Sequence, residues 1–281
     1  MRVQWRRQWR RVDHGPDTLA CGNNAHAGGT GSTSVGIGTG AGSAGSYNSA
    51  NGSYSGLNVT GDNNSGGGSF AGQEVIGNAN SASGSFSGQQ VTGDNNSASG
   101  TSAGRQVTGD YNSAVGTNAG QRVSGNDNSA NGTDSGTNVE GSQNTASGTY
   151  AGRDVAGNGN SASGTWAGRN VVGDRNSASG TEAGSNVEGL HNSAGGTQAG
   201  QNVLGDRNSA SGTSAGQSVT GSYNSTSGTE AGYGVQGDYN SASGSVAGQY
   251  VTRELQQRQW QLGRPKRDRR GQQRLRLQRG Q

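Results

Sequence analysis

A single 16-residue unit repeats thirteen times, without any change of length, between residues 48 and 251 of this 281-residue chain. Asn recurs at this period from Asn48 to Asn240, and Val recurs from Val59 to Val251. Gly fills three more columns: Gly52 to Gly244, Gly56 to Gly248 and Gly61 to Gly237. A fixed period of this size predicts a solenoid, in which identical rungs stack on one another. Such a stack presents rows of identical side chains, which suit binding or display better than catalysis.

The composition excludes a large conventional core. Gly supplies 56 residues, aromatic residues make up 5% of the chain, and apolar residues make up 26%, against nearly half in a typical globular domain. A thin repetitive structure and a disordered Gly/Ser repeat both fit these values. The repeat itself favours order, because several positions have drifted freely while the Val column and two of the Gly columns are the same in every copy.

The unit reads Asn-Ser-Ala-Ser-Gly-Thr-x-Ala-Gly-x-x-Val-x-Gly-Asp-x, and its positions are numbered 1 to 16 from the Asn. Three Gly per unit disfavour a helix, at a cost of about 1 kcal/mol each. We predict short extended segments at positions 1–4 and 10–13, separated by Gly where the chain needs positive φ or a close backbone approach. Alternation along a strand places Ala at position 3 and Val at position 12 inside, with Ser at positions 2 and 4 outside. The predicted fold class is therefore all-β, a parallel β-roll or β-solenoid of about thirteen 16-residue coils.

The predicted core is very thin. The apolar burial of one Val and two Ala per coil is small beside the conformational entropy lost when sixteen residues become ordered. Backbone ladders and stacked Asn side chains must therefore contribute to stability. Packing against other chains would also help, which predicts an oligomer.

Charge divides the chain into the three predicted segments. Residues 1–31 form a basic N-terminal segment, residues 32–252 the solenoid with a degraded first copy, and residues 253–281 a basic Arg/Gln-rich tail. Residues 1–17 hold five Arg against two Asp, a net +3, and residues 253–281 hold ten Lys or Arg against two acidic residues, a net +8. The six Arg and fourteen acidic residues between them give −8, so the basic character belongs to the ends, which we predict to be disordered.

Those basic ends allow a weak nucleic-acid hypothesis, in which Arg side chains bind phosphates and interleaved Trp rings stack on bases. A solvated tail is the simpler interpretation, so we do not expect a nucleic-acid partner. The residues concerned are Arg6, Arg7, Arg10, Arg11, Arg267, Arg269, Arg270, Trp5, Trp9 and Trp260.

Several common features are missing from the sequence. Cys21 is the single cysteine, so neither a disulfide framework nor a Cys-based metal cluster can form within one chain. No apolar run approaches the roughly 18 residues of a membrane span. The basic start is not followed by an apolar stretch, so neither a signal peptide nor a membrane anchor is visible in the chain.

The Asn-Ser-Ala-Ser-Gly and Ala-Gly-x-x-Val-x-Gly segments resemble the head repeats of YadA-like trimeric autotransporter adhesins over about residues 32–252. The resemblance implies a left-handed parallel β-roll, three chains packed side by side as a homotrimer, and a place at the bacterial cell surface, in the outer membrane or outside the cell. It also implies a non-enzymatic adhesin head that binds host matrix, a cell surface or other cells. The period of 16 is longer than the usual head unit of that family, and no neck, heptad stalk or anchor strands follow the repeat.

No constellation of residues supports catalysis or a cofactor. The three histidines are His14, His26 and His191, and no base is placed beside the abundant Ser residues. The Gly-x-Gly string at residues 36–42 lacks the strand-to-helix context of a phosphate-binding loop. We therefore predict no enzyme activity, no catalytic residue and no cofactor.

Calcium is a separate question, because Gly-Asp-x-Asn is similar to the turns of calcium-binding β-rolls. Asp is frequent at position 15, but only Asp94 and Asp110 fall in neighbouring coils. A calcium ion needs several oxygen ligands, often carboxylates. We predict no metal site, and we expect these Asp side chains to cap turns.

Two kinds of surface row could bind a ligand. Ser at positions 2 and 4 and Thr at position 6 form hydroxyl rows, which either make a solvated face or, as the alternative function, bind ice or an extended glycan in a monomeric solenoid. Aromatic side chains recur at position 7 and predict a broken exposed stripe of the kind found at interfaces. The members of this stripe are Tyr54, Phe70, Phe86, Tyr150 and Trp166.

Overall fold

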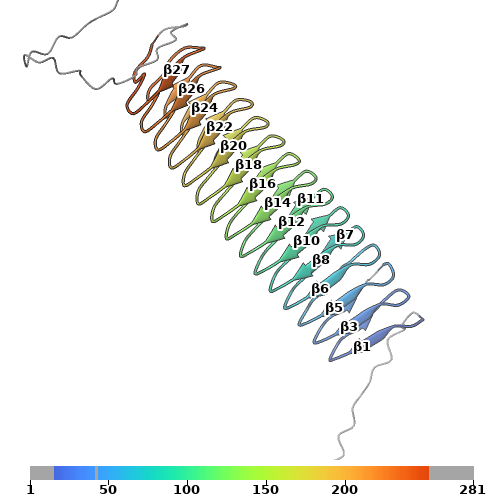
Figure 1. Ribbon diagram of the computed structural model, residues 1–281. Coiled ribbons are helices and arrows are strands. Elements are labelled where there is room, and N and C mark those ends of the chain that lie inside the picture. The colour runs from blue at the N-terminus through green and yellow to red at the C-terminus, as the bar shows by residue number, and fades with distance from the viewer. Residues whose placement is uncertain (1–15, 42–43, 253–281) are drawn as a thin grey trace, which may run out of the picture.

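The computed structural model describes residues 16–41 and 44–252, which form a rod of stacked coils (Figure 1). All strand pairs are parallel, and most join residues that are 16 apart, as in the Thr33–Ser49 and Ser227–Ser243 pairs of the longer sheet. The all-β parallel solenoid with 16-residue coils that the repeat predicts is therefore confirmed.

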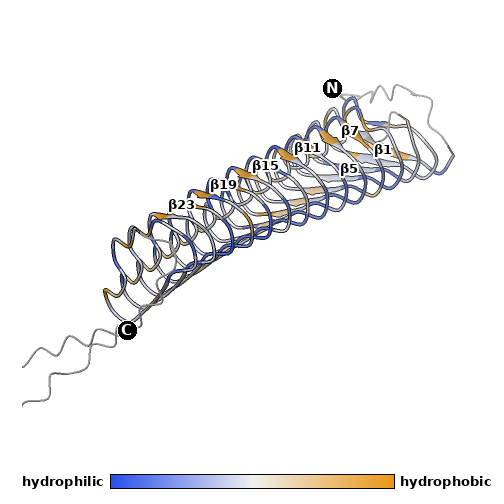
Figure 2. Ribbon diagram, turned by 90° about the horizontal axis from the view of Figure 1, so that it is seen from above, coloured by the Kyte–Doolittle hydropathy of each residue, from blue (hydrophilic) through white to orange (hydrophobic). Residues whose placement is uncertain are grey.

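Two sheets run along the rod, and Figure 2 shows the hydrophobic Val segments on one side and the Ser-Ala-Ser segments on the other. The first sheet has 15 strands: β1 (Leu19–Cys21), β3 (Thr33–Val35), β5 (Ser49–Asn51), β6 (Ser65–Gly67), β8 (Ser81–Ser83), β10 (Ser97–Ser99), β12 (Ser113–Val115), β14 (Ser129–Asn131), β16 (Thr145–Ser147), β18 (Ser161–Ser163), β20 (Ser177–Ser179), β22 (Ser193–Gly195), β24 (Ser209–Ser211), β26 (Ser225–Ser227) and β27 (Ser241–Ser243). The second sheet has 10 strands: β7 (Val75–Ile76), β9 (Val91–Thr92), β11 (Val107–Thr108), β13 (Val123–Ser124), β15 (Val139–Glu140), β17 (Val155–Ala156), β19 (Val171–Val172), β21 (Val187–Glu188), β23 (Val203–Leu204) and β25 (Val219–Thr220). A two-stranded sheet near the N-terminal end pairs β2 (His26–Ala27) with β4 (Gly40–Ala41).

Small apolar side chains fill the inside of the rod. The Val column at position 12 is only 1–4% exposed from Val59 to Val235, and the Ala column at position 3 is equally buried. Ser at positions 2 and 4 faces outward, so the predicted facing of both segments is confirmed. A further inward column lies at position 8, where Ala or Ser is buried in every coil, as at Ala103 and Ser135.

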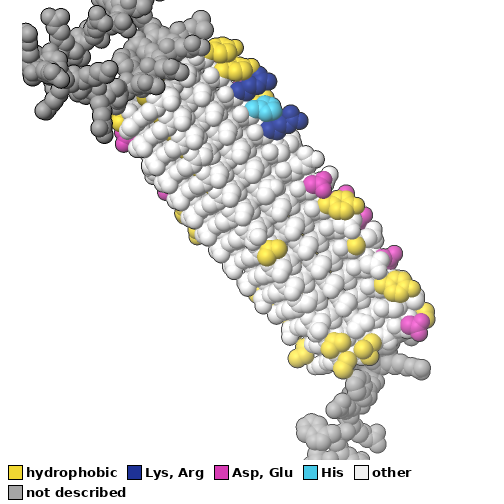
Figure 3. Space-filling model, viewed as in Figure 1, with side chains coloured by type: hydrophobic (Ala, Val, Ile, Leu, Met, Phe, Trp, Pro, Cys, Tyr) yellow, Lys and Arg dark blue, Asp and Glu magenta, His cyan; other side chains and the backbone are white. Residues whose placement is uncertain are grey.

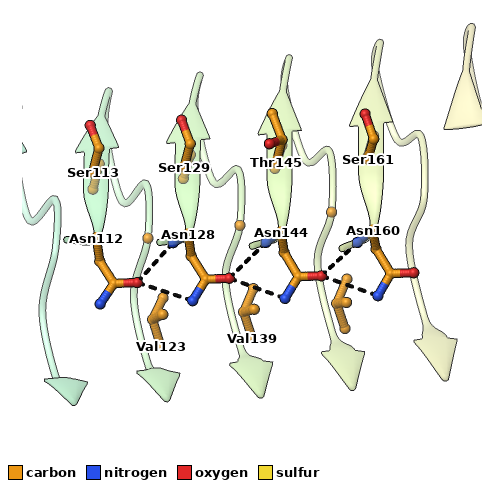
Figure 4. Close-up of a pocket in the computed structure, with 18 of the residues that line it drawn as sticks. Asn112, Ser113, Val123, Asn128, Ser129, Val139, Asn144, Thr145, Asn160 and Ser161 are labelled. Atoms are coloured by element: carbon orange, nitrogen blue, oxygen red, sulfur yellow. Dashed lines mark hydrogen bonds between the residues drawn. The ribbon is translucent and has the colours of Figure 1, made fainter. Parts of the chain in front are cut away.

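The Asn side chains at position 1 form a buried hydrogen-bonded column (Figure 4). The Nδ2 of Asn144 donates to Oδ1 of Asn128 (3.0 Å) and to the carbonyl oxygen of Gly157 (2.8 Å). Its Oδ1 accepts from the backbone N–H (2.9 Å) and from Nδ2 (3.1 Å) of Asn160. Both donors and both acceptor positions of the amide are thus used, and the pattern repeats from Asn80 to Asn208.

Each coil turns at three corners, and each corner starts at a Gly column and ends two residues later at a second residue with positive φ. In one coil the three corners are residues 164–166, 168–170 and 173–175. A Cβ on Gly173, whose φ is +126°, would lie 2.1 Å from the carbonyl oxygen of Gly189 in the next coil. Both reasons given for the Gly columns, positive φ and close approach, therefore hold. The closing residues, Trp166 among them, are mostly not Gly, and the left-handed conformation costs about 1 kcal/mol or more for each.

The solenoid begins earlier than the sequence predicts. β1 pairs with β3 through Leu19 and Thr33, a shift of 14 residues rather than 16, so part of the segment 1–31 belongs to the first coil. The predicted boundary at residue 32 is wrong because a search at a period of 16 does not detect a 14-residue coil. Residues 1–15 and 253–281, with His14 and the basic and Trp residues of the nucleic-acid hypothesis, lie outside the described residues.

The described residues contain no helix of the length and apolarity needed to cross a lipid bilayer.

The interior holds only a narrow hollow. Its volume is about 70 Å³, and it is lined by residues of positions 1, 2, 3, 9 and 12 in the twelve coils between Asn48 and Thr226. Averaged over these coils, the volume is smaller than the roughly 10–15 Å³ that one water molecule needs.

Replacing Asn144 with Ala tests the asparagine column. The change leaves the backbone N–H and Nδ2 of Asn160 and the carbonyl oxygen of Gly157 without their partner, each at a cost of about 1–3 kcal/mol. We expect a loss of at least about 3 kcal/mol in the free energy of unfolding, measured by urea denaturation. The control is Asn131→Ala, an exposed Asn of the same sheet, and an equal loss in both variants would contradict the role of the column.

Candidate binding face

A face rich in hydroxyl groups covers one side of the rod, and we call positions 2–6 of the units between residues 49 and 245 the hydroxyl face. The first sheet turns the side chains of positions 2 and 4 outward, Gly at position 5 adds no side chain, and position 6 follows at the corner. Position 2 and position 6 hold Ser or Thr in all thirteen units. Position 4 holds Ser except at Asn51, Gly67, Val115, Asn131 and Gly195. Figure 3 shows the result, a broad face with few hydrophobic side chains.

The hydroxyl face is free of charge. None of the thirteen units carries a charged residue at positions 2–6, although the solenoid contains six Arg and fourteen acidic residues. All twenty stand at positions 7, 10, 11, 13, 15 and 16, which lie on the other faces and corners. The absence of charged residues from positions 2–6 was visible in the sequence, but only the structure shows that these positions share a face.

Position 13 serves as an internal control for this composition. It is also an exposed strand position, in the second sheet, yet it holds residues as different as Ile76, Glu140, Val172 and Leu204. An outward strand position of this solenoid therefore folds without a hydroxyl group. The uniform Ser and Thr of positions 2 and 6 therefore contrast with the varied residues that the fold accepts at position 13.

The hydroxyl face has the geometry of a grid. Neighbouring coils stand about 4.8 Å apart along the rod, and positions 2 and 4 are about 6.7 Å apart along a strand. From Thr101 to Thr229, nine consecutive coils present an exposed Thr at position 6. These side chains are short and have little rotamer freedom to lose on binding. The face is therefore neutral, and its side chains are largely preorganised.

The aromatic side chains at position 7 stack along the rod. The ring centroids of Tyr54, Phe70 and Phe86 are 5.2 and 5.1 Å apart in succession, and those of Tyr150 and Trp166 are 4.1 Å apart. Stacking covers much of the ring faces, and three of the five residues are half-buried. The predicted stripe exists, but its rings pack on one another and leave mainly their edges for a partner.

Position 10 makes contacts between coils that the sequence reasoning missed. The Nε2 of Gln89 donates to the carbonyl oxygen of Phe70 in the preceding coil (2.9 Å), and the Nε2 of Gln217 makes the same bond to Gln198 (2.9 Å). Ser185 does so through its Oγ, which lies 3.0 Å from the carbonyl oxygen of Trp166. The frequency of Gln at this position was the available signal, but nothing in the sequence showed which carbonyl it reaches.

The side chains at position 15 connect adjacent coils. The Oδ1 of Asp174 accepts the backbone N–H of Asn158 (2.7 Å), and the Oγ of Ser222 accepts that of Asp206 (3.0 Å). The acceptor thus serves the preceding coil, rather than the residue's own turn as predicted. This explains why Asp, Asn and Ser share the position, since each offers an oxygen on a short side chain. The one exception is Leu190, which offers no acceptor to the N–H of Asp174.

The histidines and carboxylates do not gather into a site. His26 lies in β2, and His191 is exposed at position 16 of a distant coil. Within residues 16–41 and 44–252, no group of three or more His, Cys, Asp or Glu side chains could hold a metal ion. The neighbouring Asp94 and Asp110 are joined through a backbone bond, in which Oδ1 of Asp110 accepts the N–H of Asp94 (2.8 Å).

The structure places the chain in the class of parallel β-solenoids. No protein-family model matches the sequence, and no curated protein is significantly similar to it. The resemblance to adhesin heads therefore rests on the repeat motif alone.

Replacing Leu190 with Asn tests the connection at position 15. The new amide oxygen gives the backbone N–H of Asp174 the acceptor that eleven neighbouring pairs of this column already have. We expect a gain of about 1 kcal/mol in the free energy of unfolding. Leu190→Ala is the control, because it removes the leucine without supplying an oxygen. Equal stabilities of the two variants in urea denaturation would show that the acceptor is unimportant.

Proposed function

We propose that this chain is a non-enzymatic adhesive module that binds host matrix, a cell surface or other cells through its hydroxyl face. The observation that carries the proposal is the contrast between two kinds of exposed strand position. Positions 2 and 6 keep Ser or Thr in every unit, whereas position 13 accepts apolar, acidic and polar residues alike.

A rigid rod with a repeated face suits adhesion for a physical reason. Each coil can make only a weak contact, because a few short hydroxyl side chains bury little surface. Thirteen units in one fixed register let many such contacts form together, so that the combined affinity exceeds that of any one of them. The face also loses little conformational entropy on binding, since its side chains are short and its backbone is fixed on both sides by neighbouring coils.

The hydroxyl face is tested by two matched triple variants. The first replaces Thr149, Thr165 and Thr181 with Lys, which places bulk and charge on the neutral face. The control replaces Ala156, Val172 and Glu188 of the same three units with Lys, at equally exposed positions outside the face. Beads coated with the full chain should adhere to cultured cells and matrix-protein coats, and the first variant should weaken adhesion at least tenfold while the control retains it.

The outcomes of that assay separate clearly. Circular dichroism confirms that both variants keep the β-type spectrum of the parent chain. Equal adhesion of the two variants would show that the contact lies outside the hydroxyl face. If beads coated with the parent chain adhere no more strongly than bare beads, the proposed adhesive function is contradicted.

A second candidate function rests on the same face. The unbroken row from Thr101 to Thr229, with neighbouring coils about 4.8 Å apart, gives a monomeric rod the repeated hydroxyl groups with which to bind ice or an extended glycan. The same variants distinguish this candidate: thermal hysteresis, or binding to a glycan array, should be present in the parent and lost only with the Thr replacements. An active parent in these assays that fails to adhere to cells would favour the second candidate.

From the repeat motif we also propose that three chains associate side by side at a bacterial surface. The Val column is 1–4% exposed within a single chain, so three chains are not needed to bury it, and the motif is the ground for this proposal. Light scattering of the full chain at low salt should give three times the chain mass of 28.1 kDa, independent of concentration. A mass of one chain would contradict the trimer and leave the proposed adhesive face untouched.

A further inference from the structure

Two Arg side chains in neighbouring coils lie over aromatic rings of position 7. The guanidinium carbon of Arg153 is 5.5 Å from the ring centroid of Tyr150, and that of Arg169 is 4.8 Å from the ring centroid of Trp166. The two rings stack on each other at 4.1 Å, and all four side chains are half-buried. Cation–π contacts of this kind stabilise the position of each guanidinium group. The cluster therefore holds two Arg side chains one coil apart, a separation of about 4.8 Å along the rod.

Neither Arg side chain has a polar partner in the described part of the chain. Arg153 and Arg169 make no hydrogen bond and no ion pair there. The Nε of each is buried without a partner, whereas their Nη atoms, which also lack a partner, remain open to the surface. A guanidinium group is always charged and offers donors in a fixed fork, so the Nη atoms of this cluster are available to a ligand that supplies acceptors.

The carboxylates around the cluster are bonded elsewhere. Oδ1 of Asp134, at position 7 of the preceding coil, accepts from Nδ2 of Asn118 one coil further back (3.2 Å). Oε2 of Glu182, at position 7 of the following coil, accepts from Nε2 of Gln198 one coil further on (3.0 Å). Asp154 accepts from the amide at position 11 of the preceding coil (2.6 Å). The two neighbouring positive charges thus repel each other without an ion pair, and an anion bound between them would offset that repulsion.

No other unit combines an aromatic residue at position 7 with Arg at position 10. Phe70 is followed by Gln73, and Arg105 is preceded by Ser102. Gln at position 10 also strengthens the stack, as Gln89 does by donating to a carbonyl oxygen of the preceding coil. The two Arg of the cluster make no such bond. They replace a contact between coils with a charge at the surface, which favours a role in binding over a role in folding.

We propose that Arg153 and Arg169 bind a carboxylate or sulfate group of an acidic glycan that lies against the rod. The guanidinium fork matches the oxygen atoms of such a group, with which it forms charge-assisted hydrogen bonds. Thr149 and Thr165 of the hydroxyl face immediately precede the two rings in the chain, so they offer hydrogen bonds to sugar hydroxyl groups beside the acidic group. The site borders the hydroxyl face but does not depend on the adhesive function.

The charge of the remaining rod favours a sparsely charged glycan over a nucleic acid. The solenoid has fourteen acidic residues against six Arg. A nucleic acid has a phosphate at every nucleotide, so it would meet this negative surface along its whole length. A glycan with isolated acidic groups can place one of them on the Arg pair and lay its neutral hydroxyl groups on the uncharged hydroxyl face.

The experiment titrates the full-length chain with a hyaluronan hexasaccharide, whose only charges are carboxylates, with sulfated maltohexaose, whose only charges are sulfates, and with neutral maltohexaose. Single-stranded DNA is the fourth titrant. The Nε–H signals of Arg153 and Arg169 in NMR spectra report on the site itself, and their absence from the Arg153→Gln and Arg169→Gln variants assigns them. We expect saturable shifts of both signals with at least one acidic sugar and no shift with neutral maltohexaose.

Matched double variants separate the site from the basic ends of the chain, which also attract acidic sugars. Arg153→Gln with Arg169→Gln removes the pair and suits the fold, because six units have Gln at position 10. Arg105→Gln with Arg122→Gln removes the same charge from other coils. By calorimetry, the first variant should bind the acidic sugar at least about tenfold more weakly than the parent, and the control within about twofold of it.

Circular dichroism should show the β-type spectrum of the parent in both double variants. Three results would each overturn the proposal: equal affinity of the two double variants, no shift of the Arg153 and Arg169 signals with either acidic sugar, or saturation of these signals by DNA at a lower concentration than by either sugar.

Discussion

The structure depends on the buried column of asparagine amides at position 1. Around Asn144, each amide donates twice and accepts twice, and it joins three coils in doing so. This arrangement works only when Asn meets Asn in the neighbouring coil, so a slip of one residue would leave several buried polar groups without partners. The amide column therefore fixes the register and explains why thirteen units keep one length. It also supplies stability that the thin Val and Ala core cannot.

The fixed register has a consequence for the surface. Positions 1, 3, 8 and 12 and the three Gly columns determine the fold, which leaves the outward positions free to vary. Positions 7, 10, 11, 13 and 16 have varied, and fourteen of the twenty charged residues stand there, with the other six at position 15. The side chains at positions 2 and 6 also point outward, so the fold does not restrict their identity, yet they remain Ser or Thr in every unit. This difference is the ground on which we propose the hydroxyl face as the binding face.

Much of the fold could be predicted from the sequence because thirteen copies of the unit show which positions are constant and which vary. The period indicated the solenoid, alternation indicated the facing of Ala and Val, and the Gly columns marked the corners. Three features could not be predicted, because each depends on a neighbouring coil or on a changed period. Trp166 and its equivalents adopt positive φ despite being poor residues for it, Asp174 serves the coil before its own, and the first coil has 14 residues. The rows of the hydroxyl face could be predicted as well, but their contrast with position 13 required knowledge of which positions are exposed.

A column of identical interactions makes each coil depend on its neighbours. Each Asn accepts hydrogen bonds from the Asn of the next coil, as Asn144 does from Asn160, so the coils keep one register along the described rod. The rows of positions 2, 4 and 6 share this register, because Thr33 and Val35 of the β3 coil stand in line with Ser49 and Asn51. Each added coil therefore adds one more equivalent weak contact to the outward face, which is the property that the proposed multivalent adhesive surface requires.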